Sequence, residues 1–217
     1  MGAEWRKCKM KTRFTTRDLV YIAVFGALWG VLEITVGSYL HLIFPPVTTP
    51  LVGVGTIMAA IGMVLALIGR LFVPRAGSVL MIGVVVAILK ALSMGGVKLP
   101  AMIGIIIECL LAELSLFLSR KPGRGGFMLA GCLAVLWTFF HKFFASYVFL
   151  GRGIYDVYLE MLKKGAQALD LEMGYALVII AAYLLVRIVA GGLAGWLAWD
   201  LGKAVQARLT GGERALE

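Results

Sequence analysis

Long apolar runs separated by short polar breaks dominate this chain. Six runs approach the roughly 20 apolar residues that a helix needs to cross the hydrocarbon core of a membrane. They cover residues 19–40, 51–72, 76–94, 100–118, 126–150 and 174–199. Prolines and glycines, which commonly mark the ends of helices, occupy most of the breaks. The pattern predicts an all-α membrane protein, a bundle of six transmembrane helices.

The segment between the fifth and sixth runs has a different pattern. Between residues 154 and 171, apolar side chains recur at helical spacing and polar side chains take the opposite face. The apolar set is Ile154, Tyr155, Val157, Tyr158, Met161 and Leu162, and the polar set is Asp156, Glu160, Lys163, Lys164 and Gln167. This arrangement predicts a short amphipathic helix on the outer membrane surface. Two roles are open for it, a simple connector or a lid over an outward-facing pocket.

Composition agrees with a membrane location. Hydrophobic residues make up 61% of the 217 residues and charged residues 15%, whereas a soluble domain is typically about half apolar and a quarter charged. The length suits one membrane domain, residues 19–199, between a basic cytoplasmic tail (1–18) and a C-terminal tail (200–217). We expect no cleavable signal peptide and a multi-pass protein of the cell (inner) membrane.

The net charge of +9 matters mainly through its distribution. With the N-terminus inside, 14 Lys and Arg residues fall in inner segments and 4 in outer segments. The inner set is Arg6, Lys7, Lys9, Lys11, Arg13, Arg17, Arg70, Arg75, Arg120, Lys121, Arg124, Lys203, Arg208 and Arg214, and the outer set is Lys98, Arg152, Lys163 and Lys164. Cytoplasmic loops are enriched in Lys and Arg, so both ends are predicted to be cytoplasmic. The N-terminal basic cluster either only sets this topology or also contacts anionic membrane lipid.

Several ionisable side chains lie inside the predicted spans, where a charge costs about 2.5–3.5 kcal/mol on insertion scales and usually marks function. At a rise of 1.5 Å per residue, one group from four helices falls at a similar depth in the outer half. This group is Glu33, Lys90, Glu108, His141 and Lys142. It forms either internal ion pairs or the lining of a water-accessible cavity for a small polar solute.

Aromatic side chains in the same helices suit such a cavity. Trp29, Phe140, Phe144 and Tyr147 are available, but Trp137 is favoured because it lies four residues before His141 on the same helical face. A second pair lies deeper. Glu113 and Arg187 are each about thirteen residues from the outer end of their helices, and we expect them to form a structural ion pair near the midplane.

Small residues four apart allow two helices to approach closely. The first helix contains Ala23-x-x-x-Ala27 and Gly26-x-x-x-Gly30, and the sixth contains Gly191-x-x-x-Gly195. The patterns of both helices lie toward the cytoplasmic side, so we expect these faces to be available to a partner subunit.

The layout resembles the substrate-binding S component of energy-coupling factor (ECF) transporters. The resemblance rests on the basic N-terminal tail, on Thr15-Thr16-Arg17-Asp18-Leu19 leading into the first helix, on the Ala23 and Ala27 pattern, and on six spans in about 200 residues. It covers nearly the whole chain. It implies a subunit that captures a vitamin or vitamin precursor, or a transition-metal ion, from outside and has no enzyme activity of its own.

The same resemblance implies partners and a site. A membrane coupling subunit would contact Ala23 and Ala27, and two ATPase subunits would supply the work. The solute site would lie in the outer half, capped by the loops after the first, third and fifth helices. The predicted site residues are therefore Glu33, Lys90, Glu108, Trp137, His141 and Lys142.

Missing motifs narrow these expectations. No G-x-x-x-x-G-K-[ST] motif occurs, so the chain has no P-loop for ATP phosphates. Because His41 and His141 are the only histidines, a nitrogen-ligand metal cage is disfavoured, and we expect an organic solute, no cofactor and no nucleic acid. Cys8, Cys109 and Cys132 are expected to form no disulfide. The alternatives are a stand-alone secondary transporter or channel and, less favoured without an H-E-x-x-H or G-x-S-x-G motif, an intramembrane enzyme.

Overall fold

The computed structural model describes residues 14–43, 53–93, 99–119 and 123–214. Within these ranges the chain forms seven α-helices and one short 3-10 helix, with no strand. They are α1 (Thr16–Ile43), α2 (Val54–Phe72), α3 (Ser78–Leu92), α4 (Leu99–Leu118), α5 (Arg124–Leu150), α6 (Ile154–Leu169), η2 (Met173–Tyr175) and α7 (Ala176–Arg214). The N-terminal basic cluster with Cys8, most of the first predicted loop, Lys98, Arg120 and Lys121 lie outside the described residues.

Five of these helices, α1, α2, α4, α5 and α7, are long and apolar enough to cross a membrane. The remaining apolar helix, α3, has 15 residues. A helix satisfies its backbone N–H and C=O groups internally, which is what the hydrocarbon region demands. The chain is a multi-pass, all-helical membrane protein. The count of six spans, with α3 as the sixth, stays a prediction.

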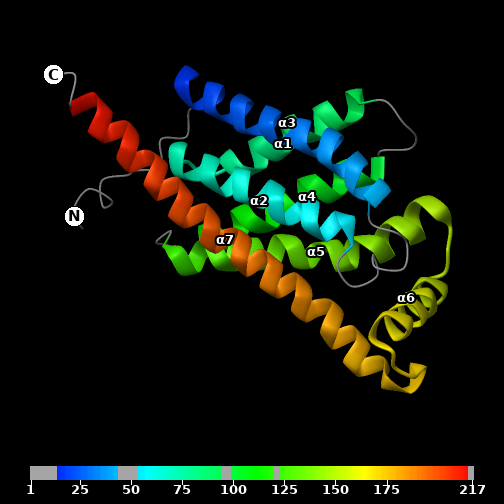
Figure 1. The fold of residues 1–217 in the computed structure, drawn as a ribbon. Helices are drawn as coiled ribbons and strands as arrows, with labels where there is room; N and C mark the ends of the chain where they lie inside the picture. The colour runs from blue at the N-terminus through cyan, green and yellow to red at the C-terminus, as the bar shows by residue number, and fades with distance from the viewer. Residues whose placement is uncertain (1–13, 44–52, 94–98, 120–122, 215–217) are drawn as a thin grey trace.

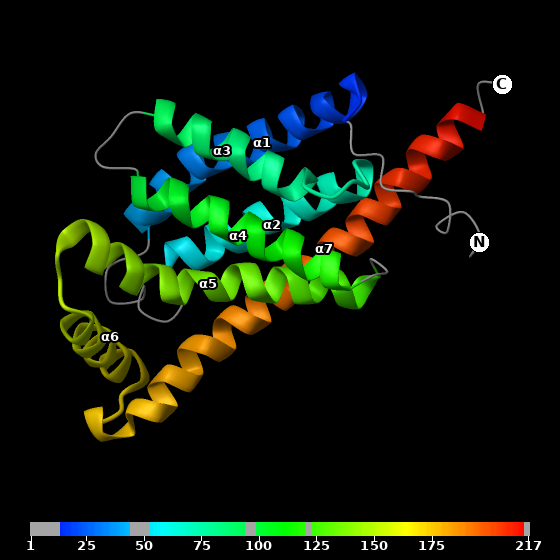
Figure 2. The same ribbon diagram turned by 180° about the vertical axis from the view of Figure 1, so that it is seen from behind.

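Helices α1 to α5 run side by side, and α7 crosses them obliquely (Figures 1 and 2). Helix α3 packs against α1 and α4, and α5 packs against α4 and α7. The start of α1, the turn between α2 and α3, and the end of α7 lie at one end of the bundle, called here the terminal end. Helix α6 lies at the opposite end, called the α6 end.

The described cations are distributed unevenly between the two ends. At the terminal end, Arg17, Arg70, Arg75 and Arg124 belong to helix ends and a turn, and Lys203 and Arg208 belong to the C-terminal part of α7. Arg152, Lys163 and Lys164 belong to the α6 end. Because Lys and Arg favour the cytoplasmic side, this distribution supports the prediction that the terminal end is cytoplasmic.

Two glycines with positive φ shape the turns. Gly77, with φ of +90°, precedes α3 in the short turn that follows α2. Gly151, with φ of +62°, ends α5 and redirects the chain into α6. A residue with a Cβ atom rarely adopts this backbone conformation, so glycine lets both turns be tight.

The glycine patterns lie inside the molecule, while the alanine pattern lies on its surface. A Cβ atom on Gly26 or Gly30 would press into Val85 or Leu89 of α3, and Cβ atoms on Gly191 and Gly195 would overlap the backbone of α5. The expectation of a free partner face is therefore wrong both for Gly26 with Gly30 and for Gly191 with Gly195. Ala23 and Ala27 are exposed.

The predicted amphipathic helix is confirmed as α6. Its residues Val157, Met161 and Leu162 are buried, and the last two pack with Ile179 and Tyr183 of α7. Two members of the predicted apolar face, Ile154 and Tyr155, are exposed instead. They belong to the first turn of α6 and take no part in this apolar contact with α7.

Helix α7 continues beyond the predicted end of the sixth span. The helix runs to Arg214, although residues from 200 onward were predicted as a tail. The extension packs against the last turn of α2, where Gln206 Nε2 donates a hydrogen bond to the Leu71 carbonyl oxygen at 2.7 Å. A Cβ atom on Gly202 would overlap the Leu71 side chain. This contact between distant segments accounts for the added helical turns.

Candidate functional site

Glu33 of α1 and Lys90 of α3 form an ion pair in the half of the bundle nearer the α6 end. Their Oε1 and Nζ atoms are 3.1 Å apart, and both side chains are partly buried. Close packing of α1 on α3 through Gly26 and Gly30 brings the two side chains together. The sequence left two alternatives for the predicted polar group, internal ion pairs or the lining of a water-accessible cavity. Glu33 and Lys90 form an internal ion pair.

Glu108 of α4 has a buried carboxyl group. It is 7% exposed, and no other described residue forms a hydrogen bond or ion pair with it. It lies within electrostatic range of Glu33, whose charge Lys90 offsets. A buried carboxyl group without a partner is costly and marks a site that a ligand can satisfy.

Trp137 and His141 of α5 bring two further unpaired groups to the same place. Their rings lie one turn apart with centroids 6.3 Å from each other. A Cβ atom on Gly104 would lie 3.0 Å from His141 Cε1, so the imidazole packs directly on α4. Trp137 Nε1 and His141 Nδ1 are buried and have no hydrogen-bond partner in the described chain.

The antiparallel packing of α4 and α5 places Trp137 level with Glu108. Glu108 follows Gly104 by one turn toward the terminal end, and Trp137 precedes His141 by one turn in the same direction. Since His141 touches Gly104, the next turn of each helix meets at the next level. We call Glu108, Trp137 and His141 the buried polar cluster.

The sequence favoured Trp137 as the aromatic residue of the site, but Trp29 is the most deeply buried of the candidate aromatic residues. It is 1% exposed, its indole fills the space that a side chain on Gly62 of α2 would occupy, and its Nε1 has no described partner. Its spacing held a signal, because Trp29 precedes Glu33 by four residues just as Trp137 precedes His141. Phe140, Phe144 and Tyr147 are exposed.

Lys142 lies apart from this cluster. Its side chain is exposed, and its electrostatic neighbours are Lys164 and Glu160 of α6 and Arg187 of α7. Consecutive residues of a helix differ by about 100° in direction, so Lys142 points away from His141 toward the α6 and α7 side of α5. Equal depth along the membrane normal did not place these two residues on one face.

The predicted pair between Glu113 and Arg187 is wrong. Glu113 pairs with Arg70 of α2, at 3.7 Å between Oε1 and Nη1, and its Oε2 accepts a hydrogen bond from the Val79 backbone N–H at 3.0 Å. The reason is connectivity, because α4 ends beside the turn between α2 and α3, and Arg70 precedes that turn. Arg187 contacts Thr138 of α5 instead.

The buried polar cluster offers complementary chemistry to a small ligand. An indole N–H only donates, an imidazole nitrogen accepts or donates, and a carboxyl group accepts when ionised. A polar ring or zwitterion carrying both acceptors and a donor or cation matches this set.

Comparison of the chain with protein-family models, curated proteins and solved structures gives no match.

Proposed function

We propose that this chain is the substrate-binding S component of an ECF-type importer, which captures a small water-soluble organic solute, a vitamin or vitamin precursor, from outside the cell. In this proposal the chain binds the solute and does not catalyse a reaction. The observation that carries this proposal is the buried carboxyl group of Glu108, which has no hydrogen-bond or ion-pair partner among the described residues. Trp137 Nε1 and His141 Nδ1, on the facing turns of α5, are likewise unpaired within the described part of the chain.

The energetics of these groups favour a ligand. A buried polar group without a partner costs about 1–3 kcal/mol, which a ligand that pairs it recovers. Glu108 anchors a cationic or hydrogen-bond-donating part of the solute, and Trp137 Nε1 donates to an acceptor on it. The charges of Glu33 and Lys90 already compensate each other. This ion pair therefore makes the surroundings of the cluster polar and needs no counter-charge from the ligand.

The surface of α1 supports the second half of the proposal. Ala23 and Ala27 are exposed together with Val20, Val24 and Leu28, near the terminal end. Small side chains there leave a flat face on which another helix approaches closely. Gly26 and Gly30 are occupied by α3, so the alanine face is the part of this small-residue pattern open to a coupling subunit.

The first test identifies the solute and then measures its affinity. The detergent-solubilised full chain is analysed by native mass spectrometry for a co-purifying molecule and titrated with a panel of water-soluble vitamins. We expect Glu108→Gln and Trp137→Phe each to weaken binding by about 1–3 kcal/mol, or roughly 5-fold to 150-fold. Phe140→Leu, on an exposed position of the same helix, is the control and should bind as the wild type does. Unchanged affinity in both cluster variants rules out this site.

The second test addresses the partner face. Ala27→Leu adds a bulky side chain to an exposed position and should weaken co-purification with the coupling subunit and ATPases by tenfold or more, while solute affinity stays unchanged. Ala181→Leu is the matched control, since Ala181 is an exposed alanine of α7. An Ala27→Leu variant that keeps its partners, or loses solute binding equally, contradicts the assignment. Transport by the chain alone, driven by an ion gradient, would favour the stand-alone transporter instead.

A further inference from the structure

Arg187 of α7 is a buried cation whose contacts are all neutral. The side chain is 7% exposed. Its Nε donates to Thr138 Oγ1 at 3.1 Å and its Nη1 to the Tyr183 carbonyl oxygen at 2.9 Å. The guanidinium lies over the rings of Phe139 and Tyr183, at 5.7 and 5.5 Å from their centroids. No described carboxylate pairs with it, so its charge is solvated by dipoles and ring faces alone.

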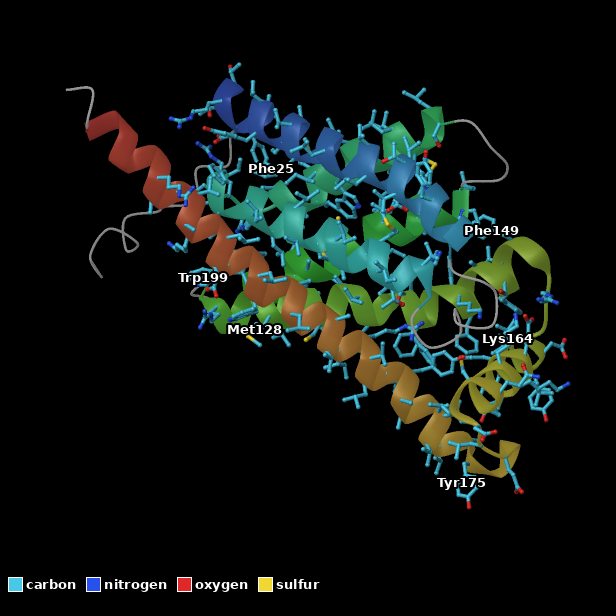
Figure 3. The ribbon with its side chains drawn as sticks, in the orientation of Figure 1. Phe25, Met128, Phe149, Lys164, Tyr175 and Trp199 are labelled. Atoms are coloured by element: carbon cyan, nitrogen blue, oxygen red, sulfur yellow. The ribbon has the colours of Figure 1, made fainter. Side chains whose placement is uncertain are left out.

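A second positive charge, that of Lys142, lies near Arg187. Lys142 of α5, one turn from Thr138, interacts with both Arg187 and Lys164 of α6, and the single carboxylate among its electrostatic neighbours is Glu160. Figure 3 shows Lys164 on α6, at the end of the bundle where α5 also ends. Three cations from three helices therefore share one region at the α6 end.

Glu160 cannot balance these three charges. Its carboxylate already accepts hydrogen bonds from Lys164 at 2.7 Å and from Arg152 at 3.0 Å. The hydrogen bond from Lys164 and its charge hold the pKa of Glu160 below its usual value, so this carboxylate stays ionised and paired. Arg187 is not among the charged neighbours of Glu160, so Glu160 leaves the charge of Arg187 uncompensated. Arg187 itself is buried within the span formed by α7, where an uncompensated charge is unfavourable unless an anion binds beside it.

We propose that Arg187, Lys142 and Lys164 form a binding site for a phosphate group between α5, α6 and α7. Guanidinium groups bind phosphate oxygens in a planar, two-pronged geometry, and ammonium groups bind them as point charges. Lys142 is exposed on the side of the bundle while Arg187 is buried behind it, which suits an anion approaching from the lipid. The site lies on a different face of α5 from His141, so it is separate from the solute site proposed above.

Lipid titration of the purified full chain tests this site. In a neutral detergent, native mass spectrometry measures binding of phosphatidylglycerol against phosphatidylcholine, and thermal unfolding measures the effect of each lipid and of inorganic phosphate. We expect phosphatidylglycerol to bind about tenfold more tightly than phosphatidylcholine and to raise the unfolding temperature. Lys142→Gln should reduce that preference about fivefold to tenfold, as loss of one charge-assisted contact predicts.

Controls separate the site from general charge attraction. Lys163→Gln removes an exposed charge of α6 that is not among the neighbours of Lys142, and it should keep the full preference. Arg187→Gln should lose the preference for phosphatidylglycerol. If Arg187→Gln does not fold, the result for Lys142→Gln decides the test. Stabilisation by inorganic phosphate alone supports the site with a free anion as its occupant, and stabilisation by phosphatidylglycerol alone supports the lipid headgroup. Equal binding of both lipids with no effect of phosphate, or an unchanged preference in Lys142→Gln, overturns the proposal.

Discussion

Replacing Gly195 with alanine should destabilise the protein by about 3 kcal/mol, near the upper end of what overpacking usually costs. Gly195 of α7 lies against the backbone of α5, where an added methyl group would overlap the Phe127 carbonyl oxygen and lie 2.7 Å from Met128 Cα. Backbone atoms cannot rotate aside as a side chain can, so the two helices must separate along their whole contact. Unfolding in mixed detergent micelles, followed by circular dichroism, measures the loss.

Gly192 supplies the matched control for that substitution. A Cβ atom there would meet only Cys132 Sγ, at 3.4 Å, which is close to ordinary van der Waals contact. Gly192→Ala should therefore leave the unfolding midpoint unchanged or raise it slightly, because alanine is the better helix former. If Gly195→Ala unfolds at the same point as Gly192→Ala, α5 and α7 are not packed as tightly as the structure shows.

Glu113→Ala should cost about 3–5 kcal/mol of stability, because it leaves a buried guanidinium without its counter-charge. Glu113 faces Arg70 at 3.7 Å and accepts the Val79 backbone N–H at the start of α3. Once the carboxylate is gone, the hydrogen bond to Ser78 Oγ at 3.2 Å is the one side-chain contact that Arg70 keeps among the described residues. Helix α3 also loses the group that caps its first turn. The free energy of unfolding in mixed micelles is the measurement.

An exposed ion pair provides the comparison. Arg124 pairs with Asp200 at the terminal end, and both side chains are exposed, so Asp200→Ala should cost no more than about 1 kcal/mol. Adding Arg70→Met to Glu113→Ala should restore part of the lost stability, because no charge is then left unpaired. Equal costs for Glu113→Ala and Asp200→Ala would show that Glu113 is not in a low-dielectric setting.

The small-residue patterns show where sequence reasoning stops. Three sets of small residues four apart have the same form, yet Gly26 with Gly30 and Gly191 with Gly195 are covered by neighbouring helices, while Ala23 with Ala27 is exposed. Spacing identifies residues that share one face of a helix. It does not say whether another part of the chain covers that face, because the covering helix is distant in sequence.

The candidate site was predicted in part for a similar reason. Depth along each helix follows from counting residues, and it singled out Glu33, Lys90, Glu108 and His141. Direction around the helix separates Lys142 from His141, although the two are adjacent in the chain. Depth also suggested Glu113 as the partner of Arg187, whereas α4 and the end of α2 bring Glu113 to Arg70.

The sequence by itself determined the positions of the five long apolar helices, since backbone hydrogen bonding within a helix and the length of an apolar run are local properties. The amphipathic pattern also determined α6, because its apolar residues recur with the helical period of 3.6 residues within one short segment of the sequence. Only the tertiary structure decided which charges meet, which faces stay open and how far α7 extends. These depend on which helices become neighbours and how each is rotated, and both are set by packing between residues far apart in the chain.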